Sequence, residues 1–176
     1  MVTRFAYIYV WLLFILAALL FFLSLLLHLS VFGGMQEPFV EFGRISFPGT
    51  VILGITTFAF TKDGRWMDQI KTCPSWMWKT ALAFGVYSLI LIGSQIIFSS
   101  ESPPSGWPIV ASGFPLGFNA IALCIIYSVL ECGYLTKSEV VKHTGISLLM
   151  VSVQIAAFLA YSAGYLHPQQ YYKFPK

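Results

Sequence analysis

The chain has 176 residues, of which 57% are hydrophobic and 10% are charged, and its formal net charge at pH 7 is +3. Soluble domains carry about 25% charged residues, so this composition argues strongly against a soluble protein. The small net charge gives no sign of nucleic-acid binding, and the length suits one membrane domain, because each span needs roughly 20 residues.

The first apolar run follows Arg4 and contains no charged residue until after Gln36. It is far longer than the apolar core of a secretory signal, which has about 7–15 residues. It predicts a membrane-spanning helix over about residues 5–32, and the pair Gly33-Gly34 that follows is a natural helix stop.

The second apolar run is the shortest. The 17 residues between Arg44 and Lys62 carry no charge, and as a helix they would extend roughly 26 Å. We predict a short span over about residues 46–61, because both flanking cations can extend their side chains toward the headgroups. A re-entrant segment is the alternative.

The segment 62–79 stands out for its charged and aromatic residues. It holds four of the ten Lys and Arg residues and three of the five Trp residues of the chain. Short loops rich in Lys and Arg stay on the cytoplasmic side of a membrane, and Trp rings favour the headgroup layer. We therefore predict a cytoplasmic loop whose topology and interface anchors are Lys62, Arg65, Trp66, Lys71, Trp76, Trp78 and Lys79.

Three further apolar runs predict spans over about residues 80–99, 115–131 and 146–165. The loop before the second of these is rich in proline. Gly113 and Gly117 have GxxxG spacing, but Pro115 between them favours a loop-to-helix joint over a packing motif. The sequence Thr136-Lys-Ser-Glu139 has the capping-box pattern, so the last helix is predicted to begin there and to run to about Tyr165.

The resulting prediction is an all-α, polytopic integral membrane helix bundle with five transmembrane helices, forming one domain over residues 1–176. Its N-terminus is predicted to be cytoplasmic, in a plasma or inner membrane. Seven Lys and Arg residues then lie inside and three outside, as the positive-inside rule requires. A bundle of four spans plus a re-entrant segment gives the same count, and five is preferred because the second run can just cross.

No known catalytic or phosphate-binding motif occurs in the sequence, and no charged residue lies in the middle of a predicted span. Neither a catalytic set, a metal site nor a cofactor is predicted. Cys73 and Cys132 fall on the predicted cytoplasmic side and Cys124 lies within a span, so no structural disulfide is expected.

Four polar side chains from four predicted spans share one depth, toward the outer leaflet. Polar groups in hydrocarbon need hydrogen-bond partners, so the main interpretation is a structural layer between helices. The alternative is an outward-opening polar pocket that binds a small ligand. The layer consists of His28, Gln95, Asn119 and Tyr161.

These features favour a small, non-catalytic membrane protein that acts as an accessory or assembly subunit, or binds a partner within the bilayer. The alternatives are a transporter or small-ligand-binding protein that uses the polar layer, and a membrane enzyme that modifies a lipid or quinone. The expected surroundings are the lipid bilayer, and the expected protein partners are other membrane subunits or a second copy of the chain. Nucleic acid is not expected.

Overall fold

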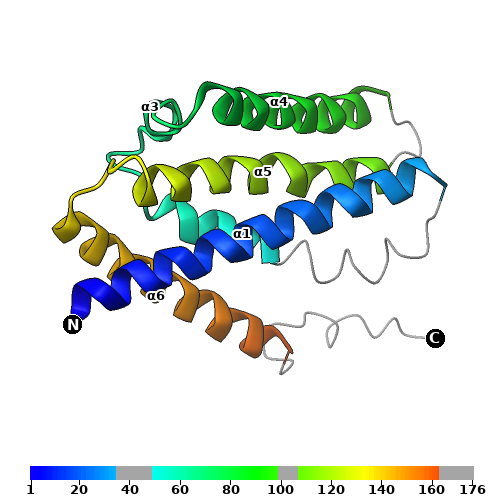
Figure 1. Cartoon of the computed structure of the whole chain (residues 1–176). Coiled ribbons are helices and arrows are strands. Elements are labelled where there is room, and N and C mark those ends of the chain that lie inside the picture. Colours follow the sequence, from blue (N-terminus) through cyan, green and yellow to red (C-terminus); the bar gives the residue numbers. More distant parts are fainter. Residues whose placement is uncertain (35–48, 99–106, 163–176) are drawn as a thin grey trace, which may run out of the picture.

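The computed structural model describes residues 1–34, 49–98 and 107–162, which form helices and no strand (Figure 1). Long uninterrupted apolar runs explain these helices, because a helix satisfies all its backbone groups within one segment. The elements are α1 (Val2–Phe32), the helix Gly49–Phe58, α3 (Trp66–Ile70), α4 (Ser75–Phe98), α5 (Trp107–Leu130) and α6 (Lys137–Ser162).

Four of these helices, α1, α4, α5 and α6, are long and apolar enough to cross a membrane. They overlap four of the five predicted spans, so the structure supports an all-helical membrane protein with four candidate spans. The predicted span over 46–61 corresponds to the shorter helix Gly49–Phe58. Its predicted beginning lies outside the described residues.

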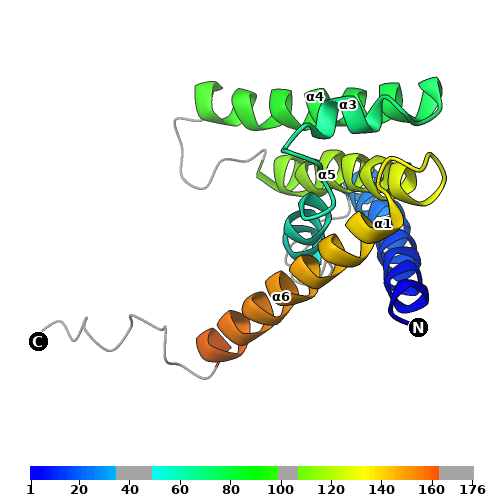
Figure 2. The same ribbon diagram turned by 90° about the vertical axis from the view of Figure 1, so that its left-hand side faces the viewer.

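α5 occupies the centre of the molecule. Figures 1 and 2 show it between α4 on one side and α1 with the helix Gly49–Phe58 on the other, while α6 crosses below. About 67% of the apolar window of α5 is buried, against 11% for α4 and 17% for α6. The core of the bundle therefore surrounds α5, and α4 and α6 have largely exposed outer faces.

The close contact of α5 with α4 depends on glycine. A Cβ atom at Gly117 would lie 2.9 Å from the backbone oxygen of Phe84 and 3.0 Å from the Cα of Gly85. The prediction of a loop-to-helix joint at Gly113 and Gly117 is wrong, because α5 already begins at Trp107 and includes Pro115. Membrane helices tolerate an internal proline where neighbouring groups satisfy the freed backbone, and here the two glycines are a packing motif.

The N-terminus, α3 and the turn after α5 lie at the same end of the molecule (Figure 1). Every Lys and Arg within the described residues belongs to this end, in the first turns of α1, α4 and α6 or in the segment that carries α3. We call it the charged end.

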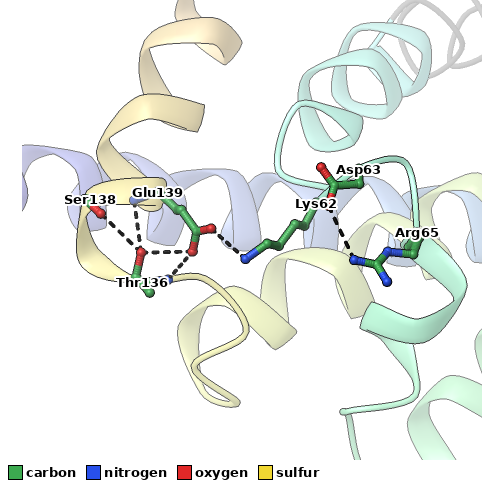
Figure 3. Close-up of polar contacts among 6 residues, drawn as sticks. All are labelled: Lys62, Asp63, Arg65, Thr136, Ser138 and Glu139. Atoms are coloured by element: carbon green, nitrogen blue, oxygen red, sulfur yellow. Dashed lines mark hydrogen bonds and ion pairs between the residues drawn. The ribbon is translucent and has the colours of Figure 1, made fainter.

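The start of α6 confirms the predicted capping box. Glu139 accepts a hydrogen bond from the backbone N–H of Thr136 at 2.9 Å, and the hydroxyl of Thr136 accepts one from the backbone N–H of Glu139 at 3.3 Å. Glu139 also forms an ion pair with Lys62 at 2.7 Å, as Figure 3 shows. Because Lys62 follows the helix Gly49–Phe58, this pair connects that helix to α6.

Candidate functional site

His28 connects three helices inside the bundle. Its Nδ1 lies 2.8 Å from the hydroxyl of Ser112 on α5, and its Nε2 lies 2.7 Å from the hydroxyl of Tyr87 on α4. The Ser112 hydroxyl donates to the carbonyl of Ile109 at 3.0 Å. The Ile109 carbonyl and Nδ1 of His28 both lie within reach of the single Ser112 proton, so the donor and acceptor roles of the two ring nitrogens depend on the His28 tautomer.

The surroundings of Ser112 decide what the Ser112–His28 pair can do. A serine nucleophile is activated when a neighbouring base accepts its proton, and here the carbonyl of Ile109 competes with His28 for the single proton of Ser112. Ser112 is also fully buried. The pair therefore has the geometry of a structural hydrogen bond and lacks the geometry of an activated nucleophile.

Asn119 forms a second cluster one helical turn away along α1. Its Nδ2 donates to the hydroxyls of Ser24 on α1, at 3.1 Å, and Thr50 in the helix Gly49–Phe58, at 3.2 Å. Its Oδ1 is buried and has no hydrogen-bond partner among the described residues. Asn119 thus joins α5 to two neighbouring helices through its amide.

Of the predicted polar layer, the structure describes the side chains of His28 and Asn119, which both lie in the interior. Their hydrogen bonds within the described residues form two neighbouring clusters, His28 with Ser112 and Tyr87, and Asn119 with Ser24 and Thr50. The side chains of Gln95 and Tyr161 lie outside the described part of the structure. His28 and Tyr87 also line a shallow groove of about 500 Å³ between α1 and α4.

A different feature, an apolar cavity of about 370 Å³, lies between α4, α5 and the helix Gly49–Phe58. Its walls include Phe58, Leu82 and Ile121, and α3 contributes Trp66 and Met67. It falls within the size range of small-molecule pockets, about 300–1,000 Å³. Most of its lining residues belong to the candidate spans α4 and α5, so in a bilayer the cavity would lie at the depth of the hydrocarbon.

Two hydroxyl groups line this cavity, and they differ in their bonding. Ser88 donates to the carbonyls of Phe84, at 2.9 Å, and Gly113, at 2.8 Å. Thr57 is 1% exposed, and its Oγ1 has no hydrogen-bond partner within the described residues. Thr57 is thus a residue of the wall whose hydroxyl is buried and has no partner among the described residues.

Gln69 holds α3 at the end of the cavity. Its side-chain amide nitrogen lies 2.9 Å from the Ser128 hydroxyl and 3.3 Å from the carbonyls of Phe60 and Ile125. A buried amide with three acceptors orders the short helix, and this keeps Trp66 in the cavity wall. Of these residues the sequence singled out only Trp66, as an interface anchor.

The predicted topology and interface anchors have different surroundings in the structure. Arg65 lies 3.4 Å from Asp63 in an exposed ion pair, and Trp76 is 71% exposed. The Nζ of Lys79 lies 5.7 Å from the ring centroid of Trp78, a cation–π contact. Of the seven anchors only Trp66 lines the cavity.

The three cysteines of the chain meet between the start of α4 and the end of α5, and all are free. Cys73 donates a hydrogen bond to the backbone oxygen of Cys124 at 3.2 Å, and its thiol is also within hydrogen-bonding reach of the thiols of Cys124 and Cys132. The bond with Cys124, followed by burial, raises the pKa of Cys73 well above its ordinary value. Burial raises the pKa of Cys132. Both thiols are therefore protonated at neutral pH, which makes them poor nucleophiles.

No protein-family model, curated protein or solved structure matches the chain. Among the described residues, no group of three His, Cys, Asp or Glu side chains is arranged to hold a metal ion. The apolar cavity with its buried threonine is the candidate binding site that the geometry defines best.

Proposed function

We propose that the protein is a non-catalytic, multi-pass membrane protein that binds a lipid-like molecule in the cavity between α4, α5 and the helix Gly49–Phe58. The observation that carries this proposal is the buried hydroxyl of Thr57, which has no partner among the described residues, in a mainly apolar wall whose Ser88 hydroxyl is already bonded to the backbone. A buried polar group without a partner costs about 1–3 kcal/mol. A ligand with an apolar chain and one carbonyl or hydroxyl would remove that cost.

Purification in mild detergent followed by mass spectrometry of extracted molecules tests the proposal. Wild-type protein is expected to retain a lipid-like molecule, and Thr57→Val is expected to retain several-fold less. Thr144→Val is the matched control, because the Thr144 hydroxyl is also buried without a partner among the described residues but lies outside the cavity wall. Equal retention by both variants, or no retained molecule in wild type, contradicts the proposal.

The proposed topology has five spans, with the charged end and the N-terminus in the cytoplasm. The gathering of all described Lys and Arg residues at that end supports it, because positive loops stay inside. A cysteine-accessibility map tests it. Labelling of both termini from the same side would refute five spans, and labelling of residues 62–79 from outside would overturn the whole topology.

An accessory or assembly subunit is the second candidate. It is favoured by the outer faces of α4 and α6, where large apolar side chains such as Leu89 and Leu149 are 69% and 66% exposed. Lipid covers such faces as readily as a protein partner does. A stoichiometric protein subunit or a second copy that remains bound in mild detergent would favour this function over lipid binding.

A further inference from the structure

The apolar cavity adjoins a second surface feature, which is lined by α4 alone. It shares Leu82 and Val86 with a shallow groove of about 520 Å³ that is also lined by Trp78 and Lys79. Lys79 lies one helical turn before Leu82, nearer the beginning of α4. The two features thus meet at Leu82 and Val86, and the groove adds a single cation beside a tryptophan.

Lys79 differs from two other cations of the same segment. Lys62 is paired with Glu139 and Arg65 with Asp63. Lys79 is exposed and has no ion pair with any described residue, and no acidic side chain lines its groove. Its charge is thus available to an anion.

A ligand that complements both features needs two parts. The cavity suits an apolar chain, and the cation at the groove's end suits a negative group at the depth of Trp78, a residue type that favours the headgroup layer. A lysine at the cytoplasmic surface of a membrane attracts anionic lipid headgroups. A zwitterionic headgroup would add a cation for which the groove provides no acidic partner.

We infer that the cavity and the groove together bind one anionic phospholipid, with an acyl chain in the cavity and the phosphate at Lys79. This inference rests on the proposed lipid binding and specifies the class of lipid. The regions around Thr57 and Lys79 then recognise different parts of the lipid. The apolar wall and the Thr57 hydroxyl hold the chain region, and Lys79 selects the headgroup charge.

Native mass spectrometry of the delipidated full chain tests the inference with two lipids that have identical acyl chains, phosphatidylglycerol and phosphatidylcholine. Wild type is expected to prefer phosphatidylglycerol by about five-fold, the effect of one lysine near the headgroups. Lys79→Gln is expected to bind both lipids equally, and Lys79→Arg to keep the preference. Lys137→Gln is the control, since Lys137 is equally exposed at the start of α6.

The outcomes separate the two proposals. Binding of neither lipid by wild type refutes lipid binding altogether. Equal binding of both lipids by wild type refutes the inference and leaves the proposed function standing. A preference that survives in Lys79→Gln, or that Lys137→Gln also removes, overturns the assignment of the headgroup to Lys79.

Discussion

α5 and α6 are both apolar enough to span a bilayer, but they are attached to the molecule in different ways. α5 is buried over about two thirds of its apolar window and contacts its neighbours through Gly117, Asn119 and other small or polar residues. α6 is 17% buried over its window. Side-chain hydrogen bonds connect α6 to other described elements in its first half, through Glu139, His143 and Ser147.

The burial of these helices shows that hydropathy does not identify the central helix. α1 has the highest mean hydropathy, 3.0, yet 33% of its window is buried, while α5 with 1.8 is 67% buried. Lipid is as apolar as leucine, so helices associate through close packing and hydrogen bonds. The centre is therefore the helix with small and polar side chains at its contacts.

Replacing Gly117 is expected to have the largest effect on stability, because a larger side chain at this position would push α4 away from α5. In Gly117→Leu the new Cβ would meet the Ser88 hydroxyl at 2.6 Å and the Phe84 backbone oxygen at 2.9 Å. Overpacking of this kind destabilises proteins by about 1–3 kcal/mol, and the backbone contact favours the upper end. Reversible unfolding in mixed detergent measures it.

Gly93→Ala in α4 is the control for Gly117→Leu, since a Cβ there has nothing within 4 Å. It is expected to leave stability unchanged or to raise it by up to about 1 kcal/mol through helix propensity. Equal stability of Gly117→Leu and wild type would show that the two helices are not in close contact.

Removing the amide of Asn119 is expected to have the second largest effect. Asn119→Ala loses two interhelical hydrogen bonds, and such bonds contribute about 0.6 kcal/mol each on average, so a loss of about 1–2 kcal/mol is expected. His28→Ala, which also loses two, should behave alike. Unfolding in detergent measures both, with Ser152→Ala, exposed and bonded within α6, as the neutral control.

The same variants distinguish a structural layer from a polar pocket. Reduced stability with unchanged lipid retention leaves the structural role. Loss of a bound small molecule at unchanged stability would instead support a polar pocket, and would contradict the purely structural interpretation of His28 and Asn119.

Features that depend on local sequence could be predicted. Four helices coincide with long uncharged runs, and the capping box of Thr136 and Glu139 predicted the beginning of α6. Both follow from neighbouring residues alone, because a buried helix needs an apolar run and a helix terminus needs a partner for its first N–H groups.

Features that depend on helix faces could not be predicted. An apolar span carries no amphipathic pattern that tells which side faces a neighbour, so the sequence did not indicate Thr57 as a wall of the cavity. Gly113 and Gly117 were misassigned because Pro115 suggested a helix start. The interior positions of His28 and Asn119 were expected from their polarity, but their separate partners depend on the helix arrangement.

Thiol labelling is expected to show that the cysteine thiols between the start of α4 and the end of α5 react slowly with alkylating reagents. Cys73 and Cys132 have raised pKa values, and only the thiolate reacts rapidly. At pH 7.5 their alkylation is expected to be at least about ten-fold slower than that of a cysteine introduced by Ser138→Cys at the exposed start of α6.

Alkylation after denaturation is the control for thiol labelling, because all cysteines should then react alike. The rates for Cys73 and Cys132 should rise as pH increases toward their pKa values. Rapid native labelling of Cys73, or a change of gel mobility upon reduction, would contradict the shielded, free thiols.

The smallest effect is expected at the charged end of α6. Lys62→Met removes the ion pair with Glu139, whose hydrogen bond raises the pKa of Lys62. Both side chains are partly exposed, 42% for Lys62 and 27% for Glu139, so global stability should hardly change. Hydrogen exchange at the first turns of α6 should nevertheless accelerate, while exchange in α5 stays unchanged.

The pH dependence of the pair follows from both partners. Because the pKa of Lys62 is raised, the pair's contribution is complete below the ordinary lysine pKa of about 10.4 and is lost as pH rises through the folded value. Because the hydrogen bond from Lys62 lowers the pKa of Glu139 from 4.5 to about 2, the contribution is also lost as pH falls from about 4.5 through about 2. High salt should reduce the difference between Lys62→Met and wild type, and Lys137→Met should show none. If exchange in α5 also became faster, α6 would open only together with the central helix, which would mean that it is attached as firmly as α5.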